Sequence, residues 1–103
     1  MAVGVVLVFP SSTDFDMQEG YDRVGRELNG GQPLQKRSDW GPGLLAHAAG
    51  PTEDGGWTVT EVWESQEAME DFQRRLMPVL QPLIAESGSE PRVHTFSVYN
   101  MAE

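Results

Sequence analysis

Residues 44–64 read LLAHAAGPTEDGGWTVTEVWE, which is two β-prone segments on either side of a turn that contains Pro and Gly. The Asp54–Gly55 step suits a tight reversal between antiparallel strands, and the flanking segments contain no further turn signal. The stretch therefore predicts a β-hairpin with strands at Leu44–Gly50 and Trp57–Glu64.

Outside the hairpin, the two ends of the chain predict two more strands. Ala2–Phe9 is a Val-rich run that stops at Pro10, and Arg92–Tyr99 alternates β-branched and aromatic residues. The segment Gln32–Gly43 has no sustained period and several Pro and Gly residues, so it is predicted to be a long loop.

Helical spacing of apolar residues predicts one helix on each side of the hairpin. The first covers residues 15–28, with Thr13 and Asp16 at the spacing of a capping box. The second begins after Ser65 as N-cap, and Pro78 is expected to break it into two pieces.

The resulting order is β-α-β-β-α-β, a ferredoxin-like α+β fold whose four-stranded antiparallel sheet carries both helices on one face. The first strand is apolar on both faces, with Val5 and Leu7 on one and Val6 and Val8 on the other. Helices of one chain cover only one face, so a second copy is expected to cover the other and form a homodimer. The 103 residues predict a single domain spanning 1–103.

Composition excludes several classes of protein. Sixteen acidic and seven basic residues give a net charge of −9, which disfavours binding to nucleic acid or to an anionic membrane surface. The absence of cysteine excludes disulfides, thiolate metal sites and a Cys nucleophile. Ala2–Phe9 is too short to span a bilayer and has no basic residue before it, so the protein is expected to be cytoplasmic.

His47 is the predicted catalytic residue. An imidazole in an otherwise apolar strand can take up and release a proton near neutral pH. The alternative is a structural histidine that hydrogen-bonds to Thr60 or Glu61 on the neighbouring strand. His94, the other imidazole, lies near the start of the last predicted strand and is expected at an edge or on the surface.

Four aromatic residues are candidates for substrate binding: Trp63, Trp40, Tyr21 and Trp57. Flat rings suit a cleft for an aromatic ligand, and a Tyr hydroxyl can hydrogen-bond to a phenolic or carbonyl oxygen. The alternative for Trp63 is that it packs in the core, and the alternative for Tyr21 is a structural role. Trp40, in the predicted loop, could be a lid over a pocket or a dimer contact.

Three motifs resemble the dimeric α+β barrel superfamily, which includes the antibiotic-biosynthesis monooxygenases. They are GLLAH at 43–47, GGW at 55–57, and VWES at 62–65 leading into Glu67-Ala68-Met69 and Phe72. The resemblance covers nearly the whole chain and implies this fold. The superfamily includes cofactor-free oxygenases of polyphenolic substrates, haem oxygenases, isomerases and cyclases. Its haem oxygenases place a haem-ligating histidine on a helix, and neither predicted helix here contains one.

These observations predict a small enzyme that acts on a hydrophobic aromatic or polyketide-like molecule, resembling the cofactor-independent monooxygenases. No flavin or haem motif is visible, and two histidines in separate strands have no third metal ligand at short spacing, so neither cofactor nor metal is expected. Two alternatives remain open: a cyclase or isomerase that uses the same pocket, or a non-catalytic dimeric protein that binds a ligand or partner.

Overall fold

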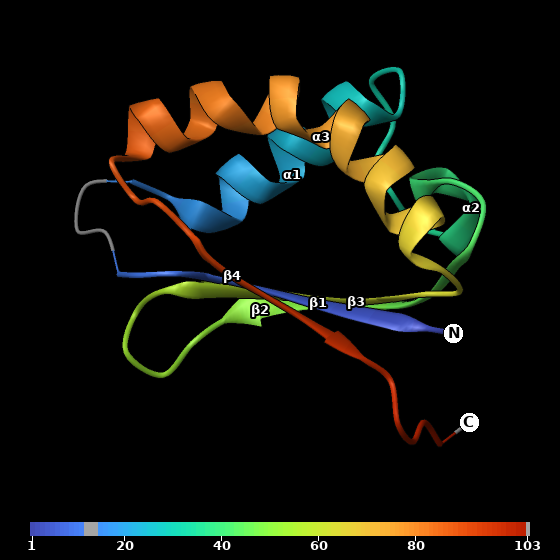
Figure 1. Cartoon of the computed structure of the whole chain (residues 1–103). Coiled ribbons are helices and arrows are strands. Elements are labelled where there is room, and N and C mark those ends of the chain that lie inside the picture. Colours follow the sequence, from blue (N-terminus) through green and yellow to red (C-terminus); the bar gives the residue numbers. More distant parts are fainter. Residues whose placement is uncertain (12–14, 103) are drawn as a thin grey trace.

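The computed structural model describes residues 1–11 and 15–102, which form a four-stranded sheet with helices on one side (Figure 1). The strands are β1 (Val3–Phe9), β2 (Leu44–Pro51), β3 (Trp57–Trp63) and β4 (Arg92–Ser97), and the helices are α1 (Met17–Leu28), α2 (Arg37–Trp40) and α3 (Gln66–Ser87). The predicted β-α-β-β-α-β order is confirmed. The short helix α2 is an addition, since it lies within the segment predicted to be a loop.

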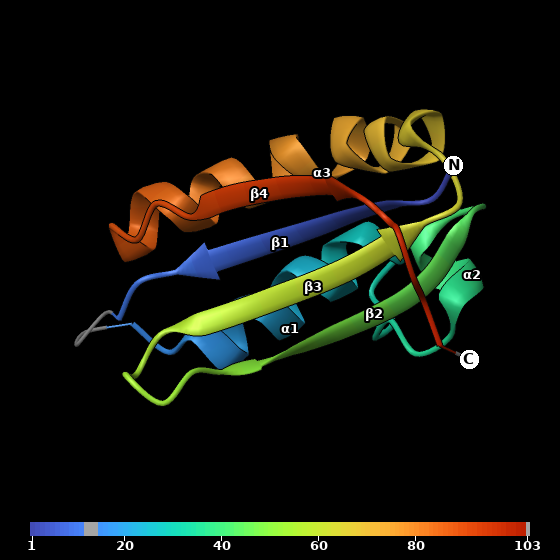
Figure 2. The same ribbon diagram turned by 60° about the horizontal axis from the view of Figure 1, so that its bottom comes forward.

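All strand pairs are antiparallel, and the strand order across the sheet is β2-β3-β1-β4 (Figure 2). The Val-rich β1 is therefore central, which suits a strand that is apolar on both faces. In the hairpin, His47 of β2 is opposite Glu61 of β3, and Glu61 is also opposite Val5 of β1. This register places one titratable pair in the middle of the sheet.

Helix α1 begins later than predicted. Its N-cap is Asp16, whose side chain accepts a hydrogen bond from the Glu19 amide at 3.1 Å. The Asp carboxylate pairs one of the amides that the first helical turn leaves without a backbone acceptor. Thr13, the other residue of the predicted capping box, lies outside the described residues.

Helix α3 is continuous, so the predicted break at Pro78 is wrong. The helix runs through both Pro78 and Pro82 and ends at Gly88, which adopts a left-handed conformation with φ of 67°. A proline removes one backbone hydrogen bond and bends a helix, but packing of the apolar face against a sheet can hold the helix together. Figure 1 shows α3 as one ribbon that changes direction along its length.

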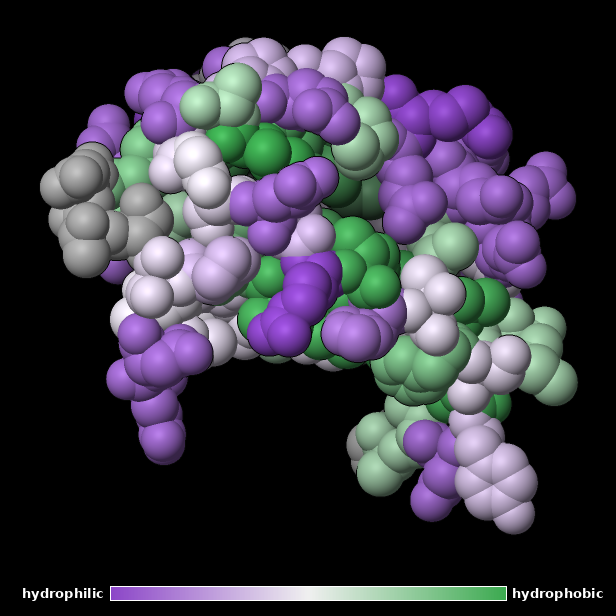
Figure 3. Space-filling model, turned by 60° about the vertical axis from the view of Figure 1, so that its left-hand side comes forward, coloured by the Kyte–Doolittle hydropathy of each residue, from purple (hydrophilic) through white to green (hydrophobic). Residues whose placement is uncertain are grey.

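The last strand ends at Ser97, two residues before the predicted end at Tyr99. The residues that follow form a tail that stands away from the rest of the surface (Figure 3). Tyr99 in this tail is fully exposed, and Met101 is exposed as well. The aromatic residue that favoured a longer strand therefore has no packing partner within the described part of one chain.

The core lies between the sheet and the helices and forms two clusters. One is centred on Trp57, Phe9 and Leu80, and the other on Trp63, Val5 and Phe72. Trp63 is completely buried. Within residues 1–11 and 15–102, no helix has the length and apolar character needed to cross a membrane.

Ser65 is the N-cap of α3, as predicted, and its hydroxyl accepts a hydrogen bond from the Ala68 amide at 3.1 Å. Ser65→Ala is expected to lower the free energy of unfolding by about 1 kcal/mol, because that amide loses its acceptor. Denaturant unfolding measures the change, with Gln66→Ala at the next, exposed position as the control. Equal midpoints for Ser65→Ala and the wild type would contradict the capping role.

Candidate functional site

An apolar cavity lies between the sheet and the helices. Its volume is about 60 Å³. A benzene-binding cavity is nearer to about 150 Å³, so an aromatic ligand needs some side chains to move. Three strands, three helices and the segment between α1 and α2 contribute residues that line the cavity: Leu7, Phe9, Met17, Tyr21, Val24, Gly25, Leu28, Leu34, Trp40, His47, Trp57, Val59, Glu61, Phe72, Leu76, Leu80 and Leu83.

Hydrogen bonds link four side chains in a row, and three of them, Tyr21, His47 and Glu61, line this cavity. The Tyr21 hydroxyl is 2.5 Å from His47 Nε2, and His47 Nδ1 is 3.0 Å from Glu61 Oε2. The other carboxylate oxygen, Glu61 Oε1, accepts a hydrogen bond from Trp63 Nε1 at 3.2 Å. The His47 and Glu61 side chains are only 10% and 7% exposed, so this network is shielded from solvent.

The strands and the first helix position this network. His47 and Glu61 face each other across the β2–β3 pair. Glu61 shares the helix-facing side of β3 with Trp57, Val59 and Trp63, because alternate residues of a strand point the same way. Tyr21 comes from α1, which packs over this face, and brings its hydroxyl to the imidazole.

The hydrogen bonds define how the network can hold a proton. In the neutral imidazole, Nε2 accepts from the Tyr21 hydroxyl and Nδ1–H donates to the Glu61 carboxylate. A proton arriving at Nε2 makes an imidazolium whose charge Glu61 balances at 3.0 Å. Both carboxylate oxygens of Glu61 are already paired, which fixes its orientation. His47 Nε2 is therefore the basic atom of the cavity, and Tyr21 lies directly on it.

Burial, together with the negative charges of Glu61 and Asp22, raises the pKa of the Tyr21 hydroxyl to about 12. Tyr21 is therefore protonated at neutral pH and acts as a hydrogen-bond donor to His47. Titration of the tyrosinate absorbance in Tyr99→Phe, which leaves Tyr21 as the single tyrosine, is expected to have its midpoint near 12. A midpoint near 10, the ordinary value for tyrosine, would place the hydroxyl in solvent.

Trp40, for which the sequence analysis proposed a lid or a dimer contact, is packed into the core. Only 7% of Trp40 is exposed, and its ring centroid lies 4.4 Å from that of His47. Its carbonyl accepts a hydrogen bond from the Arg75 guanidinium, so α3 holds α2 in place. Within one chain, Trp40 covers the imidazole and lines the cavity. The expected dimer contact is therefore not needed to explain its burial.

The other predicted residues lie in different places. Trp57 lines the cavity, with its ring centroid 5.5 Å from that of Tyr21. Trp63 shares its strand face but does not line the cavity; it packs 5.2 Å from the Phe72 ring and reaches the site only through Glu61. His94 is exposed on the edge strand β4, as expected.

Glu61 is the site residue that sequence reasoning underrated, because it was considered only as a possible partner of a structural histidine. The signal was present in the strand 57–63, where every second residue (Trp, Val, Glu and Trp) lies on the same face. A carboxylate in a row of large apolar residues has to be paired inside the protein. The structure gives it two partners, His47 and Trp63.

The structure belongs to the ferredoxin-like α+β class of folds and has a cavity between the sheet and the helices. No protein-family model matches the sequence, and no curated protein matches it closely enough to count as a relative. Solved structures do match over nearly the whole chain; one is a cofactor-independent oxygenase, and three are provisionally named antibiotic biosynthesis monooxygenases. The fold resemblance predicted from the sequence is therefore confirmed.

Three of these structures illustrate the match. SnoaB, a cofactor-independent oxygenase from Streptomyces nogalater, is 16% identical, with 97% of this chain and 95% of that chain covered and a TM-score of 0.68. Rv0793 from Mycobacterium tuberculosis is 14% identical over 100% of both chains, with a TM-score of 0.69. A Caulobacter crescentus protein provisionally named an antibiotic biosynthesis monooxygenase is 13% identical, with 96% of this chain and 91% of that chain covered and a TM-score of 0.65. At this level of identity the likeness establishes a shared fold.

Proposed function

We propose that this protein is a small enzyme that removes a proton from a neutral, hydrophobic aromatic or polyketide-like molecule, and that the resulting anion reacts with O₂ without a bound cofactor. The observation that carries the proposal is the Tyr21–His47–Glu61 chain on the wall of an apolar cavity. A buried base paired with a carboxylate is suited to proton transfer. The fold shared with a cofactor-independent oxygenase supports the second step.

The hydrogen bonds suggest a relay for the first step. The substrate gives its proton to the Tyr21 hydroxyl as Tyr21 passes its own proton to His47 Nε2. Tyr21 stays neutral throughout, in keeping with its raised pKa. The products of the step are a substrate anion and an imidazolium held by Glu61. Water is largely excluded from this wall, which strengthens the ion pair that forms.

The second step uses the substrate itself as reductant. Oxidation of an activated CH₂ group to a carbonyl releases four electrons and two protons; one O₂ takes up the four electrons, and the two protons end in water. One oxygen atom becomes the new carbonyl oxygen and the other leaves as water. The role of the protein in this step is to hold the anion in a dry, apolar site where O₂ can reach it.

Oxygen uptake tests this function. The probe is 1,8-dihydroxyanthrone, a neutral polycyclic phenol with one CH₂ activated by two rings, and the readout is O₂ consumed and ketone formed. The expected result is catalysed uptake of one O₂ for each carbonyl. Catalysed loss of the CH₂ proton with no uptake of O₂ would instead favour the cyclase or isomerase alternative. Binding with neither reaction would favour the ligand-binding protein and overturn the proposal.

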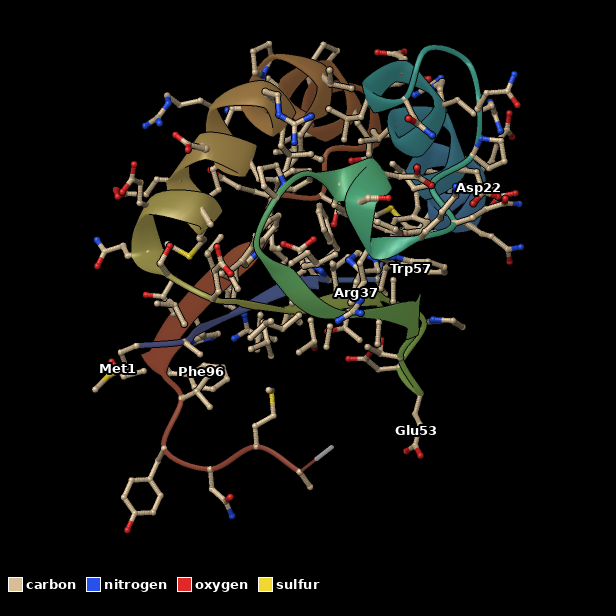
Figure 4. All side chains as sticks on the ribbon, turned by 90° about the vertical axis from the view of Figure 1, so that its right-hand side faces the viewer. Met1, Asp22, Arg37, Glu53, Trp57 and Phe96 are labelled. Carbon is tan, nitrogen blue, oxygen red and sulfur yellow. The ribbon has the colours of Figure 1, made fainter. Side chains whose placement is uncertain are left out.

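We also propose that a second copy of the chain covers the face of the sheet turned away from the helices, here called the open face. Strand alternation places Val6 and Val8 of β1, Val62 of β3 and Phe96 of β4 on this face. Figure 4 shows Phe96 on the opposite side of the sheet from Trp57. Phe96 is 48% exposed although it packs over Gly4, where a Cβ would overlap its ring.

The tail beyond β4 favours a second copy as the occupant of the open face. The tail leaves the sheet on the open side (Figures 1 and 2). It carries Tyr99, which is fully exposed, and Met101, which is 40% exposed. A second sheet stacked on the open face would bury the apolar residues of both copies. It would also give the tail a surface to pack on.

A further inference from the structure

One residue that lines the cavity has a buried polar atom that the proposed proton relay does not use. Trp57 is 7% exposed, and its indole nitrogen Nε1 is, among the residues that the structure describes, the only buried side-chain nitrogen or oxygen without a hydrogen-bond partner. A buried donor without an acceptor is costly, and such groups are rare in native proteins. This donor belongs to a residue that lines the cavity. A ligand in the cavity can therefore supply the missing acceptor.

The charges of the lining restrict the chemistry of that acceptor. An indole N–H can only donate, so the ligand group must be an oxygen or nitrogen with a free lone pair. None of the described residues that line the cavity is Lys or Arg, and Glu61 is the one carboxylate among them. A ligand that arrives as an anion would find no Lys or Arg to balance its charge and would be repelled by Glu61. The acceptor is therefore an uncharged one.

We propose that Trp57 Nε1 is the binding site for an uncharged carbonyl oxygen of the ligand. The ring of Tyr21 is a neighbour of both residues: its centroid is 5.5 Å from that of Trp57 and 6.0 Å from that of His47. A ligand that reaches both would carry its carbonyl on Trp57 and its acidic proton toward Tyr21 and His47. The substrate class is then a neutral aromatic ketone or quinone-like molecule, which rests on the proposed use of this cavity for substrate.

Isosteric probes separate this hydrogen bond from hydrophobic burial. Acetophenone carries a carbonyl oxygen, α-methylstyrene has a CH₂ in its place, and benzoate has a similar shape with a negative charge. Their dissociation constants are measured by NMR titration of the wild type, Trp57→Phe and Trp40→Phe. Phenylalanine keeps an aromatic ring at each position and removes the indole N–H. Trp40 is the matched control, because it also lines the cavity but its nitrogen is not a buried unpaired donor.

The readout is the preference for the ketone, expressed as the ratio of the dissociation constants of α-methylstyrene and acetophenone. Trp57→Phe is expected to lower this ratio by about tenfold, the size of effect expected when a buried carbonyl oxygen loses its hydrogen-bond donor. Trp40→Phe should leave the ratio unchanged, and benzoate should not bind the wild type. In the wild type, the Trp57 indole proton signal should move downfield with acetophenone and not with α-methylstyrene.

Each outcome decides the inference separately from the proposed enzyme function. An unchanged ratio in Trp57→Phe, with no ketone-specific shift of the Trp57 signal, would overturn it and indicate that a water satisfies this donor. The shift is measured on the wild type, so it decides the question even if Trp57→Phe fails to fold. None of the three probes is a substrate for oxygenation. The ketone-binding experiment can therefore succeed while the oxygen-uptake experiment fails, and the oxygen-uptake experiment can succeed while the ketone-binding experiment fails.

Discussion

His47→Ala is expected to lower the rate of substrate turnover by about 10² to 10⁴, the range typical for loss of a general base. The physical reason is that Nε2 is the basic atom of the cavity, and the remaining Tyr21 hydroxyl has no group to receive its proton. Initial rates of oxygen uptake measure the effect. The substitution also leaves Glu61 without one of its partners, so some loss of stability accompanies it.

A second variant keeps the interpretation clear if His47→Ala is poorly folded. His47→Gln has an amide that can hydrogen-bond to both Tyr21 and Glu61 but cannot take up a proton. It should retain the fold, measured by circular dichroism, and lose turnover to a similar extent. His94→Ala changes the other imidazole, on the exposed edge strand, and should keep wild-type activity. Full activity in His47→Gln would mean that His47 is a structural histidine.

Val6→Arg is expected to convert the proposed dimer into a monomer. Val6 lies in the central strand of the open face, so a second sheet packed there would have to bury an unpaired charge. The dissociation constant of the dimer should rise on the order of 100-fold. Sedimentation should give about twice 11.4 kDa for the wild type and 11.4 kDa for the variant.

The control for this prediction is Met77→Arg. Met77 is an exposed apolar residue on α3, in the helix layer on the other side of the sheet. The same new charge there should leave the dimer intact. A wild type that sediments as a monomer at micromolar concentration would contradict the proposed dimer. A dimer that survives Val6→Arg would show that another surface mediates association.

The hairpin and the strands at the two ends of the chain could be predicted from local sequence because their signals act over a few residues. The Asp54–Gly55 reversal and the Val-rich first strand specified strands that the structure reproduces. The N-cap at Ser65 depends on one side chain and one nearby amide, so it was also predictable. Pro78 was misjudged because the packing of a whole helix face decides whether a proline breaks a helix or only bends it.

The site could be predicted only in part, because its geometry depends on contacts between distant elements. Periodicity placed His47 in a strand and Tyr21 on the apolar side of a helix, but nothing local indicated that two residues 26 positions apart would meet. The partner of His47 depended on the register of the hairpin, so Thr60 and Glu61 were both open until the structure placed Glu61 opposite. The unpaired Trp57 nitrogen is likewise a property of packing alone.

The most direct test of the central claim is hydrogen–deuterium exchange of 2-tetralone in D₂O without O₂, followed by proton NMR. This neutral bicyclic ketone has CH₂ hydrogens that are acidified by both the ring and the carbonyl. Exchange therefore reports proton removal with no contribution from oxygen chemistry. If Tyr21, His47 and Glu61 form a working relay, the wild type and His94→Ala will exchange these hydrogens faster than buffer, and His47→Gln will not. Exchange at the buffer rate in the wild type, or equal exchange in His47→Gln, would contradict the claim.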